Sequence, residues 1–202
     1  MKKAFSARKV THTAIMIALG VVLAFTSIRI PPNPEITIAL LPVIILAILD
    51  GPLCGLIAGV SLGVVSIIIN VTMPASPLSP YFANPLVSVL PRALVGVGAY
   101  AAYALTKKLP IGKAKDAAAA IVGGAFGSIV NTVFVLGIMG IIYYPKISDQ
   151  LVEYGLDQTV PAFLIGIATV NGVLELIANA VLTTAVVLSL QAEARFRRSE
   201  LN

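Results

Sequence analysis

"LPVIILAILDGPLCGLIAGVSLGVVS", residues 41–66, contains two long apolar runs that are separated by one short interruption, "DGP". Gly51 can take backbone conformations that other residues avoid, and Pro52 suits the first position of a helix. The interruption therefore predicts a tight turn between two helices. Neither run alternates apolar and polar residues as a water-facing element would, so both helices are expected to lie in a membrane.

The rest of the chain has the same character. Hydrophobic residues make up 58% of the 202 positions and charged residues only 11%, with a mean hydropathy of +0.97. A soluble domain of this size has about 25% charged residues. The composition predicts an all-α integral membrane protein that forms a single domain over residues 1–202. Six apolar segments are expected to be transmembrane helices, at 12–30, 36–50, 52–71, 85–106, 117–144 and 161–191.

The basic residues indicate how these helices are oriented. The first apolar stretch follows several basic residues, as in a secretory signal, but it is long enough to span a bilayer, so we expect it to be retained. With the N-terminus in the cytoplasm, the outer segments hold only Arg29 and Lys146. The positive-inside rule then places both termini in the cytoplasm and predicts a multi-pass protein of the cell membrane. The inner segments hold Lys2, Lys3, Arg8, Lys9, Lys107, Lys108, Lys113, Lys115, Arg195, Arg197 and Arg198.

Two ionisable residues lie well inside the predicted spans. They are Arg92, in "LPRALVG", and Glu175, in "NGVLELIANA". Charged side chains within a membrane are energetically costly, so they usually face protein or water and mark function. At about 1.5 Å per residue, Arg92, Asn131 and Asn171 reach a similar depth in the outer half of the membrane. Glu175 lies one helical turn deeper, near the midplane.

These polar residues have two interpretations. They could hold neighbouring helices together, because interhelical hydrogen bonds contribute on the order of 0.6 kcal/mol and up to about 2 kcal/mol. They could instead line a cavity that binds a small molecule. A cation, an acid and amides on neighbouring spans favour the cavity, although Arg92 and Glu175 could also form a structural ion pair. Asn179 lies deeper still and is predicted to join helices.

The proline-rich segment "TMPASPLSPYFANP", residues 72–85, is predicted to be a loop at the outer face. It could cover the binding site with Tyr81, Phe82 and Asn84, or it could simply connect two helices. His12 and Cys54 are each the sole residue of their type, so we predict no disulfide within the chain and no metal site. His12 is expected to be a helix-end residue.

The chain contains no G-x-x-x-x-G-K-[ST] phosphate-binding motif and no H-E-x-x-H motif. We therefore predict that it is not an enzyme, hydrolyses no ATP and carries no cofactor. The basic residues flank apolar segments, which argues against nucleic-acid binding. A protein of this kind that pumps its substrate must obtain energy from a partner.

The chain resembles the substrate-binding S components of energy-coupling factor (ECF) vitamin importers. The resemblance rests on residues 41–66, on the Ala14-x-x-x-Ala18 pair and on six spans within about 200 residues. It implies a six-helix protein of the prokaryotic plasma membrane that binds a vitamin near the outer face. It also implies a complex with a transmembrane coupling protein and two cytosolic ATPases, with Ala14 and Ala18 facing the coupling protein.

"SPLSPYFANPLVSVLPRALVG" and "NGVLE" look most like the pantothenate-specific subgroup, with folate and cobalamin members as near relatives. Arg92 would then pair with the carboxylate of pantothenate, and Asn131 and Asn171 would meet its amide and hydroxyl groups. Glu175, Tyr81 and Asn84 complete the expected binding residues. The absence of tryptophan argues against a large flat ring such as folate or flavin.

Two other hypotheses remain open at this point. One is a carrier that acts alone and is coupled to protons or ions, with Glu175 as the relay. The other is a purely structural membrane protein whose polar residues only join helices.

Overall fold

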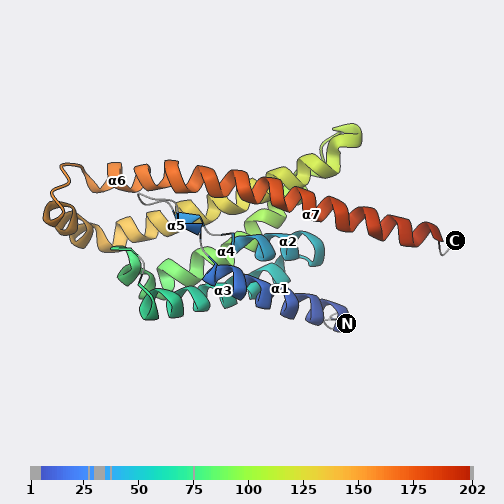
Figure 1. The fold of residues 1–202 in the computed structure, drawn as a ribbon. Coiled ribbons are helices and arrows are strands. Elements are labelled where there is room, and N and C mark those ends of the chain that lie inside the picture. Colours follow the sequence, from blue (N-terminus) through green and yellow to red (C-terminus); the bar gives the residue numbers. More distant parts are fainter. Residues whose placement is uncertain (1–5, 27, 30–34, 37, 75, 201–202) are drawn as a thin grey trace.

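The structure, a computed structural model, describes residues 6–26, 28–29, 35–36, 38–74 and 76–200. This part of the chain is almost entirely helical, as predicted (Figure 1). The helices are α1 (Ala7–Phe25), α2 (Leu40–Asp50), α3 (Pro52–Thr72), α4 (Pro85–Thr106), α5 (Lys115–Glu153), α6 (Val160–Ile167) and α7 (Val173–Glu200). Short helical turns occur at η1 (Ser79–Ala83), η2 (Gly112–Ala114) and η3 (Ala168–Gly172).

A small antiparallel strand pair, β1 (Ile28–Arg29) and β2 (Glu35–Ile36), connects α1 to α2. The sequence did not predict it, because two-residue strands are too short to show an alternating pattern. Both neighbouring helices are consequently shorter than expected. The first span ends at Phe25 and not at residue 30, and the second begins at Leu40 and not at residue 36.

Helix α2 lies at the centre of the molecule. Eight of its eleven residues are buried, and it contacts α1, α3, α4, α5 and α7. At about 1.5 Å per residue it is roughly 16 Å long, about half the thickness of the hydrocarbon core of a bilayer. It ends at the predicted tight turn, where Gly51 has a φ of 105° and Pro52 begins α3. Within the described ranges, five other helical segments are long and apolar enough to cross a membrane, counting α6, η3 and α7 as one.

Helices α3 and α4 are held close together by glycines one turn apart on α3. A Cβ atom added at Gly59 would lie 2.1 Å from the backbone oxygen of Arg92, and one at Gly63 would lie 2.5 Å from Cα of Val89. Gly55 faces Gly96 in the same way. Because only a hydrogen atom fits at these positions, the two backbones are in direct contact along much of their length.

Helix α5 is interrupted near its C-terminal end. Tyr143 has non-helical backbone angles (φ −114°, ψ 16°), two residues before Pro145. Proline lacks an N–H group and clashes with the carbonyl four residues earlier, which kinks a helix. The expected end of the fifth span at residue 144 was therefore wrong, since the helix continues past the kink to Glu153.

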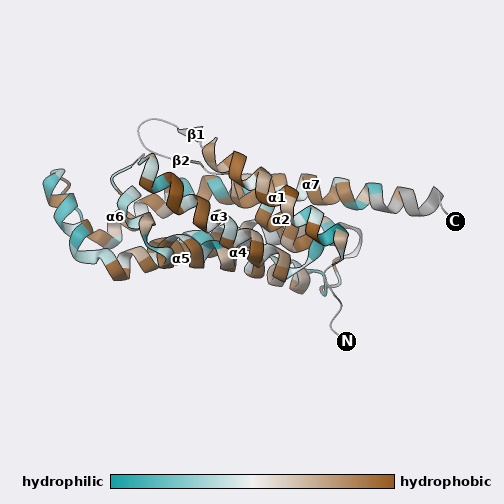
Figure 2. Cartoon of the chain, turned by 90° about the horizontal axis from the view of Figure 1, so that it is seen from below, coloured by the Kyte–Doolittle hydropathy of each residue, from teal (hydrophilic) through white to brown (hydrophobic). Residues whose placement is uncertain are grey.

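The two ends of the bundle differ. The N-terminal end of α1 and the C-terminal end of α7 lie at the same end, together with the turn between α4 and α5 (Figure 1). The opposite end holds η1, the kinked end of α5 and the start of α6 (Figure 1). Apolar residues cover much of the helices between the ends, and polar residues are frequent in the segment after the α5 kink (Figure 2).

Candidate functional site: a polar cavity at one end of the bundle

A cavity of about 630 Å³ opens at the end of the bundle opposite the termini. Its walls come from the ends of α1 and α2 and from α3, η1, α4, α5, α6, η3 and α7. Most of the lining is apolar, with a limited set of polar side chains. Small-molecule sites of about 300–1,000 Å³ usually have this composition, in which polar groups fix the ligand's orientation. The polar lining residues are Ser66, Asn70, Ser76, Arg92, Asn131, Thr132, Gln150, Tyr154, Asn171 and Glu175.

Arg92 supplies a positive charge to this cavity, as predicted from its position in the fourth span. Its Nη1 donates to the backbone oxygen of Val87 at 2.9 Å, and its guanidinium lies 5.3 Å from the ring centre of Phe82. A guanidinium has five N–H donors. The bond to Val87 fixes the direction of the side chain and leaves further donors for a ligand.

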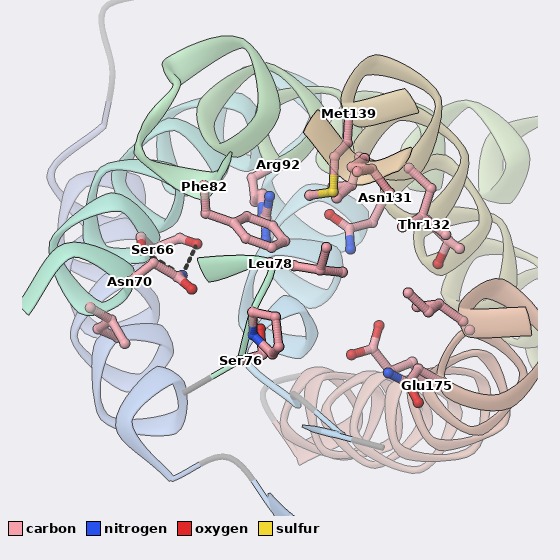
Figure 3. A pocket seen from close by; sticks show the side chains of 18 of the residues that line it. Ser66, Asn70, Ser76, Leu78, Phe82, Arg92, Asn131, Thr132, Met139 and Glu175 are labelled. Atoms are coloured by element: carbon pink, nitrogen blue, oxygen red, sulfur yellow. Dashed lines mark hydrogen bonds between the residues drawn. The ribbon is translucent and has the colours of Figure 1, made fainter. Parts of the chain in front are cut away.

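Glu175 and Asn171 lie on the wall formed by η3 and α7. In Figure 3 the Glu175 carboxylate is on the opposite side of the cavity from Arg92. The two charges attract one another electrostatically. Asn171 belongs to η3, a π-helical turn within the otherwise regular sixth apolar segment. Such turns are rare and occur frequently at functional sites.

Asn131 of α5 lines the cavity between these two walls (Figure 3). Its Oδ1 atom is buried and has no hydrogen-bond partner among the described residues. A buried polar atom without a partner costs about 1–3 kcal/mol. A ligand that donates a hydrogen bond to this atom would remove that cost.

Asn179 does not belong to the cavity lining and joins helices, as predicted. Its side chain is fully buried, and Nδ2 donates to Ser128 Oγ of α5 at 2.9 Å. Ser128 in turn donates to the backbone oxygen of Glu175 at 3.5 Å. Through Ser128, these two bonds fix α7 against α5 at Glu175 and at Asn179, one turn further along α7.

Tyr81 and Asn84 are placed differently from the prediction, since neither is among the described residues that line the cavity. Tyr81 is buried behind the wall, where its hydroxyl donates to Gln150 Oε1 at 2.8 Å and its ring centre lies 4.7 Å from that of Tyr143. Burial raises the pKa of this hydroxyl, which keeps it protonated as a donor. The contact ties η1 to the kinked end of α5.

Asn84 begins α4. Its Oδ1 accepts from the backbone N–H of Leu86 at 2.9 Å, and its Nδ2 donates to the Tyr143 hydroxyl at 3.1 Å. A helix cap of this kind is a frequent role of asparagine. The loop does contribute to the cavity, through Phe82, which the sequence had indicated, and through Ser76 and Leu78, which it had not.

The sequence analysis did not identify Ser66 and Asn70 of α3 or Gln150 of α5. Ser66 and Asn70 are four residues apart in an otherwise apolar span, the same signal that indicated Asn171 and Glu175. Gln150 gave no signal, because it lies in a segment that was expected to be a loop.

No group of three or more His, Cys, Asp or Glu residues that could hold a metal ion occurs in the described ranges. His12 instead joins α1 to α2 at the far end of the bundle. Its Nδ1 lies 3.1 Å from Asp50 Oδ2, and Lys9 Nζ donates to the backbone oxygen of Asp50 at 2.7 Å.

A family model described as "ECF transporter, substrate-specific component" matches residues 8–187. The chain belongs to this family. A comparison with curated proteins gave no match. As a member of the substrate-specific components, or S components, it is a transport subunit of the membrane that binds a small-molecule substrate and works with an energy-coupling module.

The S component family gives a context for α1. Ala14 and Ala18 are both exposed on this helix, and their neighbours Ile15 and Leu19 are 58% and 44% exposed. Thr13 and Gly20 are the buried residues of α1, so one side of the helix packs on the bundle and the other carries small and apolar side chains.

Proposed function

We propose that this S component binds pantothenate with high affinity and delivers it to an ATP-driven ECF importer. The observation that carries the proposal is a single cavity in which the Arg92 guanidinium lies beside Asn131, whose buried oxygen has no partner within the described part of the chain. An anion that also carries hydrogen-bond donors satisfies both groups. Pantothenate is such a molecule, with a carboxylate, an amide and hydroxyls.

The composition of the cavity supports a small flexible anion over a large aromatic one. The aromatic residues that line it are Phe25, Phe82, Tyr154 and Phe163, and the chain has no tryptophan. In this proposal Arg92 binds the carboxylate, Asn131 and Asn171 bind the amide and hydroxyl groups, and Glu175 borders the site. Tyr81 and Asn84 support the wall without touching the ligand.

The proposal extends to topology and partners. Six membrane-inserted helices, of which α2 is the short inner one, place both termini in the cytoplasm and the cavity toward the outside. The exposed face of α1 with Ala14 and Ala18 then contacts the transmembrane coupling protein, because small residues let two helices approach closely. Two cytosolic ATPases supply the energy.

Purification without added ligand, followed by mass spectrometry of the released small molecules, tests the substrate. We expect pantothenate, and calorimetric titration of the emptied protein should show saturable binding of pantothenate but not of folate or riboflavin. Saturable binding of folate or riboflavin in place of pantothenate would contradict the assignment.

Vesicles test the transport mechanism. Uptake of labelled pantothenate should require the coupling protein, both ATPases and ATP. Uptake by the chain alone, driven by a proton gradient, would instead identify a carrier that acts without partners.

A further inference from the structure

We propose that Ser66 and Asn70 of α3 form a hydroxyl-binding subsite at the side of the cavity away from Glu175, and that the substrate is therefore a hydroxylated carboxylate. The inference rests on the proposed function. It adds a further binding region on α3 and names the chemical group, a hydroxyl, that this region binds. Figure 3 shows Ser66 and Asn70 together on one side of the cavity, with Arg92 and Asn131 between them and Glu175.

The hydrogen bonds of Asn70 fix which of its atoms is available to a ligand. Nδ2 donates to the backbone oxygen of Ser66 at 2.9 Å and lies 3.5 Å from Ser66 Oγ. A backbone oxygen can only accept, so the amide nitrogen must face it and the amide oxygen must point away. No described residue donates to this Oδ1 atom.

The subsite therefore has a defined chemistry. Asn70 Oδ1 accepts a hydrogen bond, and the Ser66 hydroxyl can either donate or accept. An alcohol matches this pair, because it donates its proton to Asn70 and accepts from Ser66. A carboxylate does not, because it has no proton to donate to Asn70.

The other polar side chains of α3 support a ligand-binding role for Ser66 and Asn70. The helix is apolar enough to cross a membrane, and the hydroxyls of Ser61 and Thr72 donate to the backbone of the preceding turn and do not line the cavity. Only Ser66 and Asn70, among the described polar residues of α3, line the cavity. The Arg92 guanidinium, on the neighbouring helix α4, is placed to hold the carboxylate while the hydroxyl end reaches α3.

Two ligands and two variants test the subsite. The ligands are pantothenate and the same N-acyl-β-alanine without its two hydroxyls. The variants are Asn70→Leu and, as a matched control, Thr72→Val, which also loses a side-chain bond to the preceding turn of α3 but lies outside the cavity. Dissociation constants are measured by calorimetry on the full chain, with thermal unfolding as a check on folding.

We expect Asn70→Leu to weaken pantothenate binding about tenfold and to leave the affinity for the dideoxy analogue unchanged. Ser66→Ala should show a smaller loss of the same kind, and Thr72→Val should bind both ligands like the unaltered chain. Equal losses for the two ligands, or no loss for pantothenate, would overturn the subsite while the proposed function stands. If the unaltered chain does not bind pantothenate at all, the substrate assignment fails and the subsite fails with it.

Discussion

Arg92 illustrates what an ionised side chain requires within an apolar bundle. Its charge is accommodated by a backbone oxygen, the face of an aromatic ring and a facing carboxylate. The hydrogen bond to the backbone oxygen uses one of the five N–H donors of the guanidinium, so others can bind a ligand. Removal from water strengthens the remaining interactions with an anion, so this residue is expected to contribute most of the affinity for a carboxylate ligand.

The exchange Arg92→Gln should weaken pantothenate binding about 100-fold, because charge-assisted hydrogen bonds contribute about 1.5–3 kcal/mol each. Arg8→Gln, on the exposed first turn of α1, is the matched control and should bind normally. Calorimetric titration measures both. Unchanged affinity in Arg92→Gln would remove this side chain from the site.

Asn179 shows the opposite case, a polar residue whose role is structural. We expect Asn179→Ala to lower the free energy of unfolding by about 1 kcal/mol through loss of the bond to Ser128. The loss stays small because Asn179 Oδ1 is itself buried and has no partner among the residues that the structure describes, so its removal offsets part of the cost.

Chemical unfolding in detergent measures this change, with Ser189→Ala on an exposed part of α7 as the control. Pantothenate affinity should be the same in both variants. A large loss of affinity in Asn179→Ala would mean that this amide acts on the cavity.

At the level of elements, the contact between α3 and α4 sets the position of the site. Arg92 projects into the cavity from the point where the α4 backbone touches Gly59. The sequence showed that α3 was an apolar span with several glycines, but it could not show which helix would lie against them. Spacing along one helix identifies a face, and only the folded chain identifies what packs on that face.

Gly59→Ala should therefore be strongly destabilising, by about 3 kcal/mol or more, since the new methyl group would meet backbone atoms that cannot rotate away. Gly137→Ala is the matched control, because a Cβ atom there meets nothing within 4 Å. In a helix this control should be neutral or stabilising by up to about 1 kcal/mol.

Gly59→Ala and Gly137→Ala are compared by the yield of monodisperse protein and by its melting temperature. If Gly59→Ala folds and binds pantothenate as well as Gly137→Ala does, the α3–α4 contact does not position Arg92.

The interrupted elements explain why the outer wall was harder to predict than the inner helices. Pro145 suggested the end of a span, yet the helix resumes after the kink and brings Gln150 to the cavity. Similarly, the π-helical turn at η3 changes the angular spacing between Asn171 and Glu175 from the value assumed for a regular helix. Both residues nevertheless line the cavity.

Across the whole molecule, sequence reasoning succeeded where composition and periodicity dominate and failed where tertiary contacts decide. Long apolar runs sufficed to predict helices, and the energetic cost of Arg92 and Glu175 sufficed to indicate a cavity. The strand pair, the shortness of α2 and the structural roles of Tyr81 and Asn84 depend on neighbours that are distant in sequence. Ser66 and Asn70 likewise have a spacing that places them on one face of a helix, but the sequence does not show which other residues lie near that face.

The arrangement of the ends predicts a labelling pattern in intact cells. After Cys54→Ala, a single cysteine introduced by Asp157→Cys, near the cavity end, should react with a membrane-impermeant maleimide. One introduced by Lys108→Cys, between α4 and α5, should react only after the membrane is permeabilised. The reverse pattern would place the cavity on the cytoplasmic side and contradict the proposed orientation.

The aromatic rings around Tyr81 have a practical consequence for studying this protein. The chain has no tryptophan and six tyrosines, of which Tyr154 lines the cavity, while Tyr81 packs against Tyr143 behind the wall. A guest molecule in the cavity is therefore expected to change the tyrosine emission of the protein. The protein carries its own optical reporter, and occupancy can be followed without attaching a dye.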